Sequence, residues 1–323
     1  MNSNKQILLS LFNETHGGFL SGQQIADQLG CSRTAVWKHI ESLREDGYEI
    51  EAIRNKGYRI VERPNGVKEY DITTGLDTTK LGQNYFYYDT VASTQKIAHE
   101  LAQKGEPEGT LVLADQQQSG RGRMDRPWFS PKGTGIWMSL ILRPRLLPAQ
   151  TPQLTLLTAV AVAQAIEEVT GITPSIKWPN DLLIDGKKCT GILTELQAES
   201  DQVRYLIIGI GINVNQVKED FPEELRTLAT SLKMIKGQEI SRAKLVQEIL
   251  KRLERLYDIY LMQGFKPIKL LWESYADTLG KIIKAKTMHG TIQGKAIGLS
   301  DEGVLMVEEI NGTQHKIYSA DIS

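Results

Sequence analysis

The sequence predicts a multidomain α/β protein, and three observations support that prediction. The chain has 323 residues, more than one ordinary domain holds, and its hydrophobic and charged fractions of 41% and 24% are typical of globular proteins. Strand-like and helical runs alternate along its middle. Helical segments begin the chain, and short strands separated by glycine turns end it. These patterns predict domains at 1–62, 72–275 and 276–323, with a polar linker at 63–71.

The first domain combines three helical segments with a hairpin. Helical patterns over 4–14, 21–30 and 32–47 precede a strand–turn–strand pattern over 48–61, whose tip carries Asn55-Lys56-Gly57. Three helices followed by a hairpin are typical of a winged helix-turn-helix, in which the second helix of the helix-turn-helix pair enters the major groove of DNA.

The start of that helix and the hairpin carry side chains suited to DNA. Arginine can pair with guanine edges, threonine can contact a thymine methyl group, and basic side chains on the wing suit phosphates. The candidate DNA-binding residues are Ser32, Arg33, Thr34, Lys38, Arg54 and Lys56. The alternative is a protein-interaction module, because residues 1–62 hold seven Lys or Arg against eight Asp or Glu.

Composition excludes several classes of protein. The formal net charge is −1, which argues against a general polyanion binder. Cys31 and Cys189 form neither a disulfide framework nor a zinc pattern, so we expect a reducing, cytoplasmic location and no resident metal. Glu14 comes too early for a signal peptide. The apolar run Leu154–Ile166 is short and contains polar residues, so we expect a buried helix and no membrane span.

The central domain contains three short stretches that stand out from an ordinary α/β background. In the stretch 90–95, TVASTQ, hydroxyl groups precede a helix and can cap it or bind a polar ligand. The stretch 120–126, GRGRMDR, contains both glycine and arginine. Glycine allows the backbone to approach a ligand closely, and arginine suits phosphate and carboxylate groups. The stretch lacks the lysine of a P-loop. Taken alone, it is equally consistent with a solvated Arg/Gly loop.

The third stretch is KWPNDLLIDGKKCTGILTE, residues 177–195. It predicts a strand, a rigid Trp-Pro turn and a second strand, and it carries Asn180, Asp181 and Lys188. The run 207–215, IIGIGINVN, follows with two glycines inside a strand, a pattern that often marks close approach to a ligand. No nucleophilic triad accompanies these residues. Hydroxyls, amides, a cationic glycine loop and a lysine favour phosphoryl or nucleotidyl transfer by positioning and electrostatics.

In this order, STQ, QQSGRGR…W, KWPNDL, KKCTGILTE and GIGINVN resemble the biotin–protein ligases. With the winged helix before them, the whole chain resembles the bifunctional bacterial form that also represses the biotin operon. The resemblance implies a central domain of the biotin/lipoate ligase type and a C-terminal SH3-like β-barrel. It also implies catalytic roles for Lys188, Arg123 and Arg121. Biotin-binding roles are implied for Ser93, Thr94, Gln95, Gln117, Gly120, Arg121, Gly122, Arg123 and Lys188, and ATP- or adenylate-binding roles for Trp128, Asn180, Asp181 and Asn213.

The resemblance implies a two-step reaction with Mg²⁺. Biotin and ATP give biotinyl-5′-AMP, and biotin then passes to a lysine of a biotin carrier protein, a subunit of acetyl-CoA carboxylase. It further implies a homodimer that binds operator DNA when biotinyl-5′-AMP is bound. Three alternatives stay open: a lipoate–protein ligase, a biotin-sensing repressor without catalysis, and a ligase whose winged helix does not bind DNA.

Overall fold

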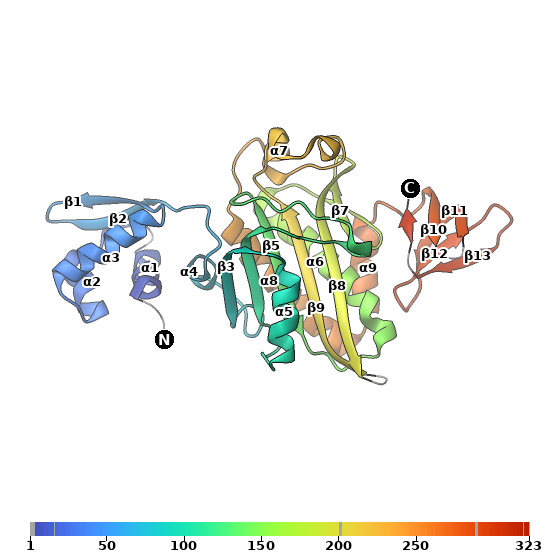
Figure 1. Cartoon of the computed structure of the whole chain (residues 1–323), viewed down its shortest axis with the longest axis horizontal. Helices are drawn as coiled ribbons and strands as arrows, with labels where there is room; N and C mark the ends of the chain where they lie inside the picture. Colours follow the sequence, from blue (N-terminus) through green and yellow to red (C-terminus); the bar gives the residue numbers. More distant parts are fainter. Residues whose placement is uncertain (1–3, 16, 200–201, 288–289, 319, 323) are drawn as a thin grey trace. The chain divides into compact units, whose positions relative to one another are not determined.

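The computed structural model describes residues 4–15, 17–199, 202–287, 290–318 and 320–322. The chain forms two compact units, Met1–Leu76 and Asp77–Ser323 (Figure 1). None of the helices in the described ranges has the length and hydrophobicity needed to cross a membrane.

The first unit is a winged helix-turn-helix, as the sequence predicts. Its elements are α1 (Asn4–Glu14), α2 (Gly22–Leu29), α3 (Arg33–Glu45), β1 (Glu49–Ile53) and β2 (Gly57–Glu62). Ser21 caps α2 and Ser32 caps α3, each hydroxyl accepting a backbone N–H three residues on. The apolar faces of the helices meet in a core that includes Leu8, Ile25 and Ile40.

The predicted linker at 63–71 differs from the structure, where a short helix, α4 (Glu69–Thr73), begins inside it. The buried Tyr48 donates a hydrogen bond of 2.6 Å to Asp71 Oδ1, and Lys68 pairs with Asp46 at 2.7 Å. These contacts attach α4 to the winged helix, and the unit extends to Leu76. The sequence does not predict this helix, because the segment is polar and the residues that hold it lie far away in the chain.

The second unit is built on a seven-stranded sheet in the order β3-β4-β5-β9-β8-β7-β6. Strands β3 and β4 are parallel, and the other neighbouring pairs are antiparallel. The strands are β3 (Tyr85–Val91), β4 (Leu111–Gln117), β5 (Gly135–Leu142), β6 (Ser175–Lys177), β7 (Asp181–Ile184), β8 (Lys187–Glu199) and β9 (Gln202–Asn213).

Helices cover both faces of this sheet (Figure 1). Helix α5 (Thr94–Gln103) packs on one face against β4, β5 and β9. The other face is covered by α6 (Thr151–Thr170), which packs against α8 (Arg242–Gln263) and α9 (Lys266–Tyr275). Helix α6 is buried over most of its length, as expected for 154–166, and the short α7 (Leu232–Lys236) follows β9. Short 3₁₀ turns lie at Arg123–Asp125, Pro148–Gln150, Lys218–Asp220 and Glu223–Leu225.

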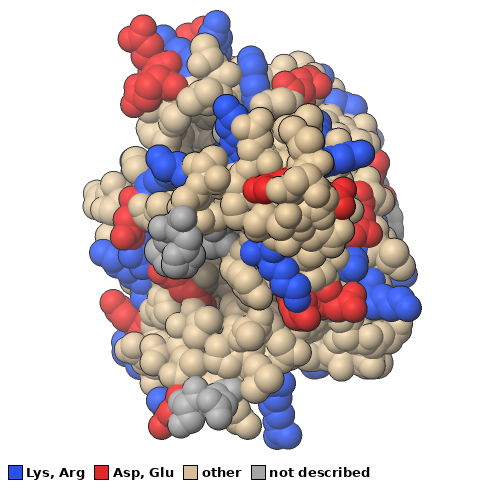
Figure 2. Space-filling view, turned by 90° about the vertical axis from the view of Figure 1, so that its right-hand side faces the viewer, with Lys and Arg blue, Asp and Glu red and all other residues tan. Residues whose placement is uncertain are grey.

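The chain ends in a five-stranded antiparallel sheet in the order β13-β12-β11-β10-β14. Its strands are β10 (Ile282–Thr287), β11 (Gly290–Leu299), β12 (Leu305–Glu308), β13 (Gln314–Ile317) and β14 (Asp321–Ile322). Gln153 of α6 donates to the carbonyl of Asp301 at 3.3 Å and so links this sheet to the larger one. Basic and acidic side chains are interspersed over the face in Figure 2, in line with the formal net charge of −1.

Candidate active site

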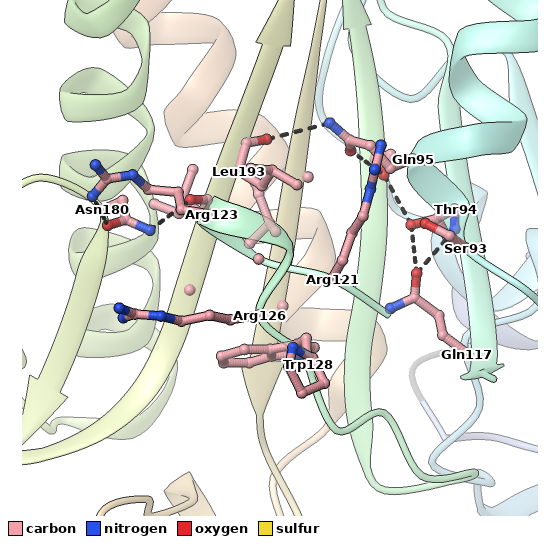
Figure 3. Close-up of a pocket in the computed structure, with 18 of the residues that line it drawn as sticks. Ser93, Thr94, Gln95, Gln117, Arg121, Arg123, Arg126, Trp128, Asn180 and Leu193 are labelled. Carbon is pink, nitrogen blue, oxygen red and sulfur yellow. Dashed lines mark hydrogen bonds between the residues drawn. The ribbon is translucent and has the colours of Figure 1, made fainter. Parts of the chain in front are cut away.

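A pocket lies on the α5 face of the large sheet, where α5 begins (Figure 3). It encloses about 800 Å³ of space between atoms, part of it open to solvent. Of the residues implicated by the sequence, those that line it are Ser93, Thr94, Gln95, Gln117, Arg121, Gly122, Arg123, Trp128, Asn180, Asp181 and Lys188. Segments up to 118 residues apart in the chain therefore meet in one cavity.

One end of the pocket is a cradle of buried polar side chains. Gln117 Oε1 accepts from the backbone N–H of Thr94 at 2.9 Å, and Ser139 Oγ lies 2.8 Å from Thr94 Oγ1. Ser139 also donates to Gln95 Oε1 at 3.0 Å, and Gln95 Nε2 donates to the carbonyl of Ile207 at 3.2 Å. A network of this kind fixes the direction of each donor and acceptor. It can therefore recognise a neutral head group that offers both carbonyl and N–H groups.

Ser93 completes the cradle. It occupies the N-cap position of α5, but its hydroxyl makes no capping hydrogen bond, although the side chain is only 2% exposed. Helix capping thus does not explain a serine here. Ser93 lines the pocket, where a ligand can reach it.

Strand glycines form the floor of the pocket. A Cβ at Gly209 would lie 2.6 Å from Gln95 Oε1, and one at Gly211 would lie 2.4 Å from Trp128 Nε1. Both contacts are shorter than real Cβ atoms make, so Gln95 or Trp128 would have to shift if the glycine beneath it carried a side chain. Within the described chain, the buried Trp128 Nε1 has no hydrogen-bond partner.

The cationic loop after β4 is folded back on itself. Trp128 N–H donates to the carbonyl of Gly120, and Gly122 N–H donates to that of Arg126, each at 2.8 Å. Met124 and Asp125 have positive φ values of 55° and 54°, a conformation that is unfavourable for residues other than glycine. The stretch that the sequence allowed to be a solvated loop is thus a hairpin-like flap over the pocket.

The arginines of the loop extend in different directions (Figure 3). Arg123 Nη1 donates to Asn180 Oδ1 at 3.2 Å, in the turn between β6 and β7. Arg121 extends to the opposite side, where Nη2 donates to Glu195 Oε1 at 2.9 Å. Arg126 also lines the pocket.

Lys188 lies at the opposite end from the polar cradle. Its Nζ is 2.7 Å from Asp181 Oδ1 and 5.3 Å from the centre of the Trp128 ring. The distance to Asp181 is that of an ion pair, although the two groups are not aligned as a hydrogen bond. The pocket therefore joins a neutral polar end to a cationic one.

Two implicated residues do not line the pocket. Gly120 lies beneath the loop, where a Cβ would be 2.6 Å from the carbonyl oxygen of Trp128. Asn213 is buried at the end of β9, and its amide oxygen accepts from Gln216 at 3.4 Å. Sequence reasoning also missed Ser139 and Glu195. Both could have been identified from the sequence: Ser139 is a polar residue in an apolar strand, and Glu195 ends the motif TGILTE.

The predicted DNA-binding residues lie on α3 and the β1–β2 hairpin. Ser32, Arg33, Thr34 and Lys38 are exposed on α3, and Arg54 and Lys56 on the hairpin. Ser32 Oγ already accepts from the backbone N–H of Ala35, so this hydroxyl serves the helix. Trp37 was not predicted; it is 53% exposed one turn after Arg33, a spacing that could have indicated it.

Family comparisons agree with each part of this architecture. The model of the Biotin/lipoate A/B protein ligase family matches residues 87–213, an HTH domain model matches 5–59, and a Biotin protein ligase C terminal domain model matches 278–323. The central match thus covers most strands that build the pocket, including the polar cradle and the cationic loop.

Individual relatives extend the similarity to the full chain. The Bifunctional ligase/repressor BirA of Bacillus subtilis is 58% identical over 315 residues, or 98% of this chain and 97% of that protein. BirA of Escherichia coli is 29% identical over 91% of this chain and 89% of its own. A solved biotin protein ligase from Aquifex aeolicus, in complex with biotin and ATP, matches 75% of this chain and 98% of its own, with 35% identity and a TM-score of 0.65. This chain belongs to the bifunctional ligase/repressor BirA family.

Proposed function

We propose that this protein joins biotin to ATP as biotinyl-5′-AMP, transfers biotin to a lysine of a carrier protein, and represses transcription through its winged helix. One observation carries the proposal. A single pocket combines a neutral polar cradle with arginine side chains from the loop after β4 and with a lysine side chain from β8. Membership of the family supports both the ligase and the repressor activities.

In the first step, a biotin carboxylate oxygen attacks the α-phosphorus of ATP. The new C–O–P bond forms as the bond to the β-phosphate breaks, and pyrophosphate leaves. Ser93, Thr94, Gln95 and Gln117 hold the neutral ureido head in the cradle, and the backbone of Gly120 to Arg123 encloses the chain and the phosphate. Lys188, Arg123 and Arg121 are assigned to offset the crowded negative charge as it develops.

Lys188 must exchange partners during this step. In the ligand-free pocket it is paired with Asp181. A biotin carboxylate and then an acyl-phosphate oxygen take the place of that carboxylate, which keeps the ammonium paired throughout. Exchanging Asp181 for a ligand anion therefore costs Lys188 little free energy.

The adenylate side of the pocket is assigned to Trp128, Asn180, Asp181 and Asn213. Trp128 offers an aromatic face to adenine beside the glycines of β9. Asn213 is proposed as a second adenine contact; its amide must turn away from Gln216 to make it. The oxygen atoms of Asn180 and Asp181 suit Mg²⁺ that is held mainly by the ATP phosphates.

In the second step, the ε-amino nitrogen of the acceptor lysine attacks the acyl carbon. An amide bond forms, the acyl–phosphate bond breaks, AMP leaves and the amine loses a proton. We assign a biotin carrier subunit of acetyl-CoA carboxylase as the acceptor and the cytoplasm as the location, in keeping with the two free cysteines.

For repression, we propose a homodimer that forms when biotinyl-5′-AMP is bound and then binds operator DNA. Arg33, Thr34 and Lys38 would read the major groove, and Arg54 and Lys56 would contact phosphates. The same protein would thus repress the genes for biotin synthesis and transport when the intermediate accumulates without an acceptor.

ATP–pyrophosphate exchange tests the enzymatic part of the proposal. The protein should exchange label into ATP when biotin is present and much less with lipoate. Exchange that depends on lipoate and not on biotin would assign the chain to lipoate ligation. Absence of exchange with either acid would leave a sensor without catalysis.

A further inference from the structure

The cationic loop is attached to the large sheet through its arginine side chains. Arg123 binds Asn180 on one side, and Arg121 binds Glu195 of β8 on the other (Figure 3). Arg121 also lies 3.3 Å from Asp125 in the same loop, but that carboxylate is largely exposed. Glu195 is therefore the fixed point that holds Arg121 to the body of the protein.

Glu195 is itself held in place. Its Oε2 lies 3.3 Å from Nε2 of His99 on α5, while its Oε1 accepts from Arg121 at 2.9 Å. The His99 ring stacks edge-on against Tyr205, at 5.7 Å between ring centres. Both carboxylate oxygens thus have partners on different elements, and the side chain is only 28% exposed.

The electrostatics keep this carboxylate charged. Hydrogen bonding from His99 lowers the pKa of Glu195, burial opposes this, and Gln95 and Arg121 lower it further. The carboxylate is consequently ionised at neutral pH. Arg121 in turn has a buried Nε without a hydrogen-bond partner among the described residues, so its attachment rests on the terminal nitrogens.

We propose that Glu195 is a positioning residue for biotin binding: through Arg121 it holds the loop against the pocket before any ligand arrives. Loop residues between β4 and β5 carry the backbone that is assigned to enclose biotin, and Gln95, one turn before His99, belongs to the polar cradle. The Arg121–Glu195–His99 contacts therefore connect the loop to the cradle. This inference rests on the proposed function of the pocket.

The tether should act on binding more than on chemistry. Arg121 is paired with Glu195, whereas Lys188 is paired with Asp181, so loss of the Glu195 contact leaves the Lys188 pair in place. A loop that is no longer pre-arranged must be ordered by the ligand, and the cost appears in affinity. A hydrogen bond to a charged group contributes about 1.5–3 kcal/mol, or roughly 10–100-fold, and partial exposure favours the lower end.

The test compares Glu195→Gln, Arg121→Gln and the double variant by biotin-dependent pyrophosphate exchange. Glu195→Gln should raise KM for biotin about tenfold and change kcat less than about twofold. Arg121→Gln also removes a charge assigned to the reaction, so it should lower kcat as well as raise KM. The double variant should be no worse than Arg121→Gln, since the contact is already lost in that single variant. Glu199→Gln is the control: it lies on the same strand, but its side chain is 80% exposed and 3.9 Å from Arg204.

Limited trypsin digestion of ligand-free protein gives a readout that does not need activity. Cleavage after Arg123 should be faster in Glu195→Gln than in wild type and unchanged in Glu199→Gln, with equal thermal unfolding temperatures. An unchanged KM together with unchanged loop cleavage, or additive effects in the double variant, would overturn the tether. Lack of exchange in the wild type would instead refute the proposed function, while digestion would still test the tether. If Glu195→Gln does not fold, loop cleavage in Arg121→Gln tests the same contact.

Discussion

Lys188 has the most demanding position in the pocket. A lysine on a strand is usually solvated, but here the ammonium is paired with Asp181 beside the Trp128 ring. In the proposed reaction, this ammonium faces the carboxylate and the phosphate that must approach each other. The positive charge of Lys188 is thus in position before negative charge develops in the transition state.

Lys188→Ala should abolish most adenylate formation. Loss of one preorganised charge costs on the order of 10²–10³ in rate. Biotin-dependent pyrophosphate exchange measures it directly, and Lys187→Ala, the exposed neighbour on β8, is the matched control. Near-normal exchange in Lys188→Ala would refute the assignment.

Arg123→Gly should release the intermediate prematurely. Without the bond to Asn180, the loop closes less firmly over biotinyl-5′-AMP. Free biotinyl-5′-AMP acylates lysines at random, so labelling of a bystander protein reports the leak, and Arg204→Gly on β9 serves as the control. Bystander labelling equal to that of wild type would contradict a retaining role.

At this scale the sequence was most informative where a motif fixes both residue type and spacing. It could place Thr94, Gln117 and Lys188 at one site, because their motifs in this order resemble those of a known family. It could not place Arg121 against Glu195, because that contact depends on how a loop with two non-glycine residues at positive φ folds back. It also placed Asn213 on the ligand, whereas its amide turns to Gln216.

Strand β9 serves as a floor because glycine alternates along one of its faces. Gly209 supports Gln95 of the cradle, and Gly211 supports Trp128 of the adenylate side. A strand without these glycines would fill the pocket with its own side chains. Their spacing of two residues places both on the same face of the sheet.

The two glycines make a matched pair of tests. Gly209→Ala should raise KM for biotin, because its Cβ displaces Gln95, and Gly211→Ala should raise KM for ATP, because its Cβ displaces Trp128. Overpacking of this kind costs about 1–3 kcal/mol, or roughly 5–150-fold in affinity. If both variants raise the same KM equally, the division of the pocket is wrong.

Glu254 of helix α8 binds the backbone at the start of the second unit. Glu254 accepts from the backbone N–H groups of Thr79, Lys80 and Leu81 at 2.7–2.8 Å. Burial raises the pKa of Glu254, but these hydrogen bonds outweigh it and lower the pKa overall. The contact therefore stabilises the fold while the group is ionised.

Glu254→Gln should destabilise the second unit by about 1–2 kcal/mol at neutral pH, because an amide has a single acceptor oxygen. The pKa of Glu254 is lower in the folded than in the unfolded protein. Its contribution to the free energy of unfolding is therefore complete above about pH 4.3 and is lost as the pH falls further. Urea unfolding at a series of pH values should show that the free energies of unfolding of wild type and variant become equal in acid. Asp258→Asn, one turn later on α8, is the control, and a gap that is independent of pH would contradict the account.

At the scale of elements, the sequence predicted α3 from its helical pattern and α6 from its apolar run. It did not reveal α4, which is short and polar and is fixed by contacts with Tyr48 and Asp46. Strand order was also beyond the sequence, because β9 pairs with β5 across a long separation. Local patterns determine elements; distant contacts determine how they pair.

For the whole molecule, two activities on one chain require that ligand occupancy be communicated to DNA binding. If biotinyl-5′-AMP binds the dimer better than the monomer, linkage requires that it raise operator affinity by the same free energy. Mobility-shift titration should show about 5–150-fold tighter binding with biotinyl-5′-AMP than without it. Equal affinity would exclude a corepressor role.

Arg33→Ala and Lys56→Ala separate the two kinds of DNA contact. Arg33→Ala should weaken operator binding by about 1–3 kcal/mol and leave binding to unrelated DNA nearly unchanged. Lys56→Ala should weaken both and reduce the salt dependence. If neither change alters DNA binding by the wild-type dimer, the winged helix contacts DNA through another surface or serves a protein partner.

The central claim is that the pocket activates biotin and passes it to a carrier lysine. Mass spectrometry of a biotin carrier domain, incubated with this protein, biotin, ATP and Mg²⁺, tests it most directly. The account predicts one biotinyl group on one lysine of the acceptor, none without ATP, and almost none with Lys188→Ala. An unmodified acceptor, or one that gains lipoate and not biotin in a parallel reaction, would contradict it.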